Sequence, residues 1–239
     1  GRVVGGAWTP NGGDEFDTGI IRRVNSTNNT IIYTGVNFVT GDFTAGETAE
    51  FGTPATYYSR NATAGVGAVN WELATSWTFN SDGTDSGPLP STAPSGNNVT
   101  IRSGHEITIT SNSRSTFALV LEGTLNLVST LSHTFGDITG SGLLTLEATA
   151  SNNFSFPSAD ISDFTGTVDY TGSTNDGNML NTPPSFNALT FSGTSVKNLQ
   201  NVAFTITGTW NMSSGTINQT NNTTTNLSGD FNNTGATFN

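Results

Sequence analysis

Cysteine is absent from this chain of 239 residues, which excludes disulfide bonds, zinc–thiolate sites and thiol nucleophiles. Basic residues are also scarce: there are 7 Lys and Arg against 18 Asp and Glu, so the formal net charge is −11. Nucleic acids and anionic membranes both attract basic surfaces, and neither partner is expected here. No apolar run approaches the roughly 20 residues that cross a bilayer, so membrane insertion is not expected either.

Aromatic residues are plentiful although charge is low. The chain has 15 Phe, 4 Trp and 4 Tyr, and only 10% of its residues are charged. Disordered chains usually combine high charge with few aromatics, so this composition indicates an ordered protein. The abundance of Ser, Thr, Asn and Gly favours an extracellular or cell-surface location. The chain begins with Gly and ends at Asn239 within a repeating pattern, and we expect it to be an excised piece of a longer protein.

Short alternating apolar groups begin at residue 97. They are Val99 and Ile101, Ile107 and Ile109, then Phe117, Leu119 and Leu121, then Leu125 and Leu127. Period two is the signature of a strand, because successive side chains leave opposite faces of the backbone. These groups predict short strands separated by polar turns.

A phrase of the type Gly-Thr-Leu-Asn-Leu recurs further along. Its versions begin at Gly123, Gly142, Gly166, Gly208 and Gly215, at intervals of 19, 24, 42 and 7 residues. A strand-only repeat of roughly 20 residues predicts a right-handed parallel β-helix, or β-solenoid, of about seven rungs. Each leading Gly is expected at a corner that needs positive φ. Asn and Thr at repeated positions are expected to stack as ladders.

The alternative fold is an antiparallel sandwich. Such a sandwich needs hairpin turns every 8 to 12 residues. After residue 97 the only Asn-Gly or Asp-Gly pair is Asp176-Gly177, which favours the solenoid.

Three segments are predicted. Residues 1–53 form a β-rich N-terminal segment, the end of a preceding domain, with strands near 20–21, 30–33 and 36–39 and a hairpin loop at 25–29. Residues 54–96 form a Trp-containing cap with a Pro/Gly-rich loop, in which one short helical turn fits between Trp71 and Trp77. Residues 97–239 form the solenoid, which is expected to continue past the end.

The order of several motifs resembles a known family. The motifs are Tyr57-Tyr58-Ser59-Arg60, Asn70-Trp71, Thr75-Ser76-Trp77-Thr78, Val99-Thr100-Ile101 and Gly104-His105-Glu106-Ile107. Together with the spacer at 41–51 and the later rungs, they resemble the repeat modules of very large type IX-secreted surface proteins of gliding gram-negative bacteria. The resemblance covers residues 41–239 and departs from the pattern in a longer insertion after Arg60 and in Thr78. It implies a surface-exposed β-helical adhesin or stalk segment.

Two tryptophans are the candidates for ligand recognition. Trp71 and Trp77 offer a sugar-stacking platform for surface glycans, or they cap the apolar column where the helix would otherwise open to water. The cap is the favoured interpretation. His105, at a turn before Ile107, is expected to make a structural hydrogen bond.

Calcium is the only cofactor with candidate ligands. Asp82 and Asp85 lie in a Gly-rich loop and carry the oxygen ligands that Ca²⁺ prefers, although their spacing is not that of an EF-hand. Asp14 with Asp17, and Asp160 with Asp163, are weaker candidates. A solvated acidic loop is the favoured interpretation of each.

The leading hypothesis is a non-catalytic segment of a large secreted surface protein, serving as adhesin, stalk or filament component. Its expected partners are other segments of the same chain or surface-assembly proteins. The first alternative is a polysaccharide lyase or hydrolase, for which Asp160, Asp163 and Asp169 would share a face of successive rungs. The second alternative is a glycan-binding module.

Overall fold

The computed structural model describes residues 2–4, 7–9, 21–25, 30–34, 55–60, 69–81, 89–148, 153–172, 176–199, 203–219 and 224–239. The contacts divide the chain into two compact units, Gly1–Thr53 and Pro54–Asn239. Within the described residues no helix is long and apolar enough to cross a membrane.

The first unit contains two antiparallel strand pairs. β1 (Arg2–Val4) pairs with β2 (Ala7–Thr9), and β3 (Ile21–Asn25) pairs with β4 (Thr30–Thr34). The expected strands on both sides of residues 26–29 are therefore present. The strand expected at 36–39 and the spacer at 41–51 lie outside the described residues.

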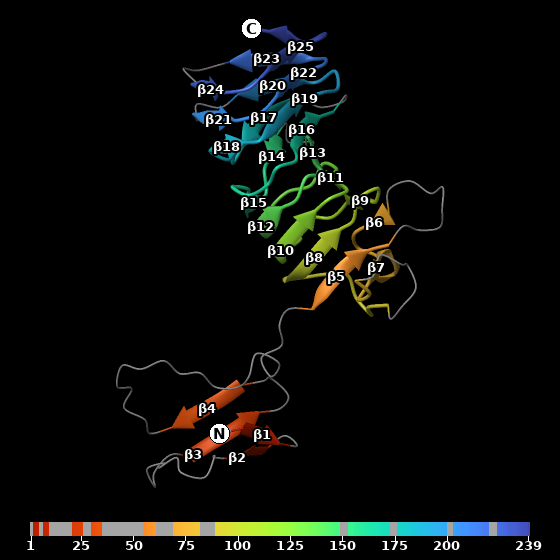
Figure 1. Ribbon diagram of the computed structural model, residues 1–239, viewed down its shortest axis with the longest axis vertical. Coiled ribbons are helices and arrows are strands. Elements are labelled where there is room, and N and C mark those ends of the chain that lie inside the picture. Colours follow the sequence, from red (N-terminus) through yellow and green to blue (C-terminus); the bar gives the residue numbers. More distant parts are fainter. Residues whose placement is uncertain are drawn as a thin grey trace. The chain divides into compact units, whose positions relative to one another are not determined.

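The second unit is a parallel β-solenoid of about six turns. The predicted fold class is confirmed, and the number of turns is close to the predicted seven. Figure 1 shows its strands stacked one above another. One eight-stranded sheet contributes a strand to each level. Its strands are β6 (Val69–Asn70), β9 (Glu106–Ile109), β11 (Thr124–Leu127), β13 (Leu143–Glu147), β16 (Thr167–Thr171), β19 (Ala188–Phe191), β22 (Trp210–Met212) and β25 (Phe231–Asn233). Its strand pairs are parallel, which rules out the antiparallel sandwich for this unit.

The cross-section of the solenoid changes along the stack. Early turns complete the coil with a six-stranded sheet, and later turns with a five-stranded and a three-stranded sheet. The six-stranded sheet contains β5 (Thr56–Ser59), β7 (Trp77–Thr78), β8 (Asn97–Ile101), β10 (Thr116–Leu121), β12 (Thr134–Thr139) and β15 (Ser158–Asp160). The five-stranded sheet contains β14 (Asn153–Ser155), β17 (Gly177–Leu180), β20 (Val196–Leu199), β23 (Thr216–Gln219) and β26 (Thr237–Phe238). The three-stranded sheet contains β18 (Ser185–Phe186), β21 (Phe204–Ile206) and β24 (Thr225–Leu227).

The core is a set of apolar columns that run through the turns. In one column Leu125 pairs in register with Ile107 and Leu144, and Val168 and Leu189 continue it. All five side chains are at most 1% exposed. Burying an aliphatic side chain of this size stabilises the folded state by about 1.5–3 kcal/mol. The alternating apolar positions of the sequence are thus the inward positions of successive strands.

One inward position was assigned wrongly from the sequence. Phe117 is 66% exposed, whereas its neighbour Thr116 is buried. The register of β10 against β8 shifts between Thr116 and Ala118. This irregularity turns Phe117 outward and breaks the simple alternation at the start of β10.

Four of the five leading glycines serve a different purpose from the one expected. Gly123, Gly142, Gly166 and Gly208 do not have positive φ; Gly215 does, at 81°. The first four precede strands of the eight-stranded sheet and lie at one corner of the coil, where the backbone of consecutive turns approaches closely. A Cβ on Gly142 would lie 2.2 Å from the carbonyl oxygen of Gly123, and one on Gly166 would lie 2.1 Å from that of Gly142. Close stacking, not a left-handed conformation, requires these four glycines, whereas Gly215 has the positive φ expected of it.

The expected side-chain ladders are present on the outside of the five-stranded sheet. Asn198 Nδ2 donates to Asn178 Oδ1 at 3.2 Å, and Asn218 Nδ2 donates to Asn198 Oδ1 at 3.0 Å. Asn239 continues the ladder with a 3.1 Å bond to Asn218. Each amide satisfies its neighbour in the next turn, so the ladder fixes the parallel register.

Candidate functional site

Trp71 and Trp77 close the N-terminal end of the solenoid. Trp71 follows β6, and Trp77 begins β7 after the single helical turn at Ala74–Ser76. Their rings pack edge to face with centroids 4.8 Å apart, and Trp71 also stacks on Phe135 of β12. Trp71 Nε1 donates to the oxygen of Pro94 at 3.4 Å. Aromatic rings therefore fill the end of the apolar columns.

The burial of these rings corrects the glycan-platform interpretation. Both side chains have no exposed surface, and a sugar ring can stack only on a face that solvent reaches. In this structure Trp71 and Trp77 offer no such face. Their contacts match the cap, which was the favoured alternative.

A carboxylate ties this cap to the turns beyond it. Glu72 Oε1 accepts hydrogen bonds of 3.1 Å from Arg114 Nε and from the Ser111 amide. Glu72 Oε2 accepts a 3.3 Å bond from the Thr110 hydroxyl. The two side chains of the ion pair are 18% and 30% exposed, so water screens their attraction only in part.

His105 has the structural hydrogen bond expected of it. Its Nδ1 lies 2.9 Å from Ser59 Oγ. The same oxygen accepts a 2.9 Å bond from the amide of Arg102, so Ser59 connects β5 to both residues. The guanidinium of Arg102 lies 5.2 Å from the ring centroid of Tyr58 and donates to the oxygen of Asn80. This corner joins β5 to the first full turn.

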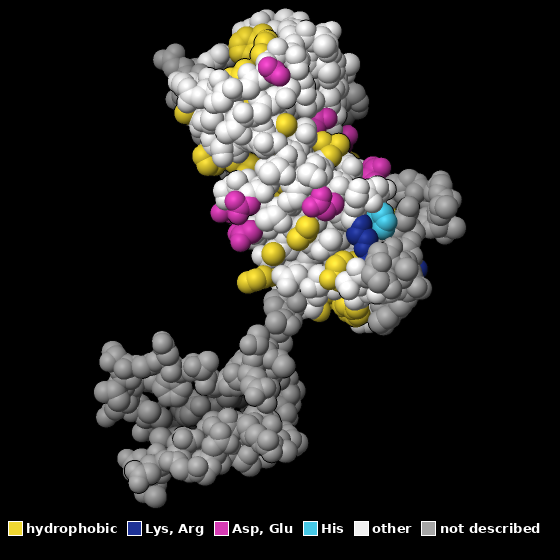
Figure 2. Space-filling model, viewed as in Figure 1, with side chains coloured by type: hydrophobic (Ala, Val, Ile, Leu, Met, Phe, Trp, Pro, Cys, Tyr) yellow, Lys and Arg dark blue, Asp and Glu magenta, His cyan; other side chains and the backbone are white. Residues whose placement is uncertain are grey.

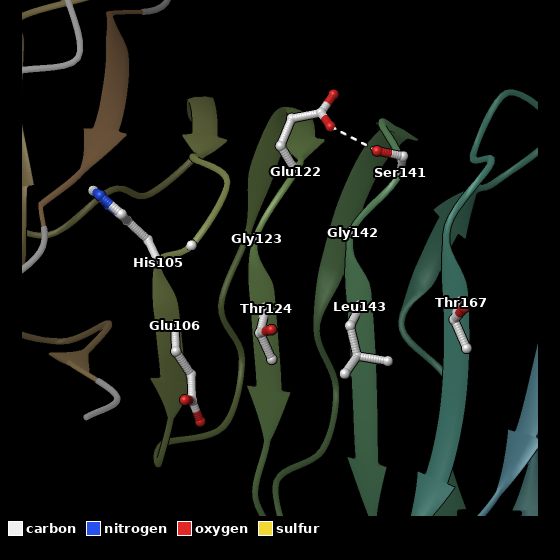
Figure 3. Close-up of a pocket in the computed structure, with 10 residues that line it drawn as sticks. His105, Glu106, Glu122, Gly123, Thr124, Ser141, Gly142, Leu143 and Thr167 are labelled. Atoms are coloured by element: carbon white, nitrogen blue, oxygen red, sulfur yellow. Dashed lines mark hydrogen bonds between the residues drawn. The ribbon is translucent and has the colours of Figure 1, made fainter.

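A hollow of about 470 Å³ lies on the outside of the glycine corner. Gly104, Gly123 and Gly142 are among the residues that line it, and Thr124, Leu143 and Thr167 lie in a row on adjacent strands (Figure 3). Its two carboxylates, Glu106 and Glu122, point in opposite directions and do not converge. Glu106 accepts from Asn126 at 2.6 Å, and Glu122 accepts from Ser141 at 2.9 Å. The side-chain hydrogen bonds of this hollow connect consecutive turns.

The structure separates the carboxylates that the enzyme alternative requires. Asp160 ends β15 of the six-stranded sheet, whereas Asp169 belongs to β16 of the eight-stranded sheet, and Asp163 lies in the turn between them. The expectation that the three share one face is therefore wrong. Asp82 and Asp85, like Asp14 and Asp17, lie outside the described residues. Among the described residues no three metal-binding side chains gather at one place.

Lys197 is a buried cation that sequence reasoning missed. It takes an inward position in β20 and has no exposed surface. Its ammonium donates to the main-chain oxygens of Ser192, Gly193 and Ser195, the last two at 3.2 Å. Burial lowers the pKa of Lys197 to about 8, although the carboxylates of Asp169 and Asp176 oppose that shift. The ammonium satisfies the carbonyls of one corner from inside the core.

Asp169 and Ser195 add buried polar atoms near Lys197. Burial raises the pKa of Asp169, while a 2.7 Å hydrogen bond from Ser192 Oγ opposes the rise. Asp169 Oδ1 and Ser195 Oγ have no hydrogen-bond partner. Neither their register nor their burial is visible in a single sequence.

His133 is the second buried titratable group. Its Nδ1 accepts a 3.2 Å bond from the Arg114 amide, and its Nε2 lies 2.9 Å from Thr130 Oγ1. Nδ1 must be unprotonated to accept, so His133 is neutral with its proton on Nε2. Burial, with a smaller effect of the Arg114 charge, lowers the pKa of His133 to about 4.

No protein-family model, curated protein or solved structure matches the chain.

The surface of the solenoid is mostly uncharged and polar. Figure 2 shows few basic side chains on the face in view and scattered acidic ones. The basic residues after residue 97 are Arg102, Arg114 and Lys197, and each makes the hydrogen bonds within the solenoid described above.

Proposed function

We propose that this chain is a non-catalytic β-solenoid segment of a large secreted cell-surface protein, which serves as a stalk or as an adhesin or filament component. The observation that carries the proposal is the unbroken eight-stranded sheet, in which every level from β6 to β25 pairs in register with the next. Such a stack has fixed length and direction, because each strand pairs in register with the strand of the next turn. A stack of this kind suits a segment that separates or presents other segments of a larger protein.

Three further features support a mechanical and extracellular role. The hydroxyl- and amide-rich surface has few Lys residues, and the absence of Cys makes the fold independent of redox state. The hydrogen bonds between adjacent turns point along the stack, so a force along the stack is carried by the bonds of each level. The polar side-chain clusters described above connect adjacent turns or close an end of the solenoid.

A force measurement tests this role. The full chain, attached through its two ends, is stretched in a single-molecule instrument. If the segment is a spacer, the chain is expected to resist the applied force and then to lengthen in steps, as individual turns separate from the stack. Extension at negligible force, as for an unfolded chain, would overturn the proposal.

An activity measurement tests the enzyme alternative separately. The protein is incubated with a panel of acidic and neutral polysaccharides, and new reducing or unsaturated ends are measured. The proposal expects none above a heat-denatured control. Products that disappear in the Asp169→Asn variant would establish the enzyme alternative.

A further inference from the structure

The three sheets of the later turns all end at the same face of the solenoid. β24, β25 and β26 are the last strands of the three-stranded, eight-stranded and five-stranded sheets. Each is paired on one side, with β21, β22 and β23 respectively. We call the opposite side of these strands the stacking face.

Two large apolar side chains occupy inward positions on the stacking face. Phe231 stands in register with Trp210, and Phe238 stands in register with Ile217. Trp210 and Ile217 are 7% and 0% exposed, whereas Phe231 and Phe238 are 49% and 46% exposed. Figure 2 shows hydrophobic side chains at the end of the solenoid where β25 lies. The same columns that are covered in earlier turns are therefore uncovered here.

Two amide ladders also reach this face. Asn239 donates to Asn218, and Asn232 donates to Asn211, each at 3.1 Å. In the ladder below, each Oδ1 accepts from the turn above, as Asn198 does from Asn218. The Oδ1 atoms of Asn232 and Asn239 are thus placed to accept from a further amide in the same register.

The edge strands lack the Lys, Pro and bulges that commonly keep an edge unpaired. Exposed edges are usually blunted by Lys, Pro or bulges. β24, β25 and β26 read Thr-Asn-Leu, Phe-Asn-Asn and Thr-Phe, and Asp230 is the single charged residue between 224 and 239. The opposite end contrasts with this, because Trp71 and Trp77 close it and β7 runs antiparallel to β5.

We propose that the stacking face binds one further parallel β-solenoid turn. That turn places apolar side chains over Phe231 and Phe238 and amide side chains over Asn232 and Asn239. A second copy of this end fits less well. Two such ends would meet with their strands antiparallel, whereas the amide ladders need a parallel, in-register neighbour. At one inward column the added turn meets a polar side chain instead of an apolar one. This side chain is Asn233, which hydrogen-bonds within its own turn to Gly235 and Ala236.

An added turn tests the proposal directly. Residue 239 stands above residue 218, so a copy of residues 199–219 joined after Asn239 continues the coil in phase. A control extension has the same length but carries Ser in place of the copied Phe204, Ile206, Trp210, Met212 and Ile217. Amide hydrogen exchange is then followed in β25 and β26 of the complete chain with each extension.

The apolar extension is expected to slow exchange in β25 and β26 at least tenfold and to raise the midpoint of thermal unfolding, whereas the Ser extension leaves both unchanged. Equal exchange with both extensions would overturn the proposal. So would a dimer of the unextended chain that the Phe231→Lys substitution dissociates, since the face would then bind a second copy. A failure here leaves the force and activity tests of the proposed function unaffected.

Discussion

The indole nitrogen of Trp77 donates a 2.9 Å hydrogen bond to the main-chain oxygen of Trp71, and both residues are completely buried. This bond and the edge-to-face packing of the rings fix the loop between them over the open end of the columns. A solenoid exposes its core at each end unless something covers it. The pair therefore stabilises the first turns.

Replacing Trp77 by Ala is expected to lower the free energy of unfolding by about 3–5 kcal/mol, because it removes a large buried ring and leaves a cavity. Leu73 lies in the same loop and is 54% exposed, so Leu73→Ala should change stability by less than about 0.5 kcal/mol. Denaturant unfolding measures both. Equal small losses would contradict the cap.

Glu72→Ala is expected to lower the free energy of unfolding by about 1–3 kcal/mol, because the Ser111 amide and the Arg114 guanidinium both lose their hydrogen-bond acceptor. Glu72→Gln keeps an acceptor oxygen and removes the charge, so it should cost less. Thermal unfolding at low and high salt separates the two contributions. A salt-independent and identical loss in both variants would argue against the ion pair.

Gly142→Ala is expected to destabilise the fold by about 1–3 kcal/mol, because the new methyl group would meet the carbonyl oxygen of Gly123 at 2.2 Å. Ser141→Ala, at the adjacent exposed position, is the matched control and should cost less, because it removes only an exposed hydrogen bond to Glu122. If both substitutions are tolerated equally in denaturant unfolding, the turns do not approach as closely as the structure shows.

His133 is expected to weaken the fold in acid. The pKa of His133 is about 4 in the folded chain and near 6.5 in the unfolded chain. Between these values the unfolded chain binds a proton that the folded chain does not bind. Stability from this group is thus complete above pH 6.5 and falls as the pH drops toward 4, by on the order of 1–3 kcal/mol. His133→Gln removes the titration and should flatten this part of the pH profile. Parallel profiles would contradict the assignment.

Lys197 is expected to make the stability of the fold depend on pH in the alkaline range. Its pKa is about 8 when folded and 10.5 otherwise, so between these values the unfolded chain holds a proton that the folded chain has released. Stability should therefore rise from pH 8 to pH 10, by on the order of 1–3 kcal/mol. Lys197→Met keeps the side-chain length and removes the charge. The pH profiles of unfolding free energy of the two proteins should run parallel if the lysine does not titrate in this range, which would contradict the prediction.

The sequence predicted the stack because its main signals are local. Alternation marks inward residues such as Leu125 and Leu127, and a recurring phrase marks the turn length. The reason for the glycines depends on a distance between turns, which no local pattern contains.

Lys197 shows why the site details could not be predicted. Within Val196-Lys197-Asn198-Leu199 the charge suggests an outward position, yet Lys197 and Leu199 face inward while Val196 is partly exposed. The carbonyls that accept from its ammonium lie at the preceding corner. The direction of Phe117 was also mispredicted, because it depends on a register shift between its own strand, β10, and β8.

The most direct test of the parallel stack uses the natural absence of cysteine. Asn198 and Asn218 stand in register on adjacent turns, at a strand separation of about 4.8 Å that suits a disulfide. The control pair, Asn198 and Asn211, is closer in sequence but belongs to different sheets. The account predicts rapid oxidation of the Asn198→Cys/Asn218→Cys variant to an intramolecular disulfide and none for Asn198→Cys/Asn211→Cys. Crosslinking of the control pair alone would contradict it.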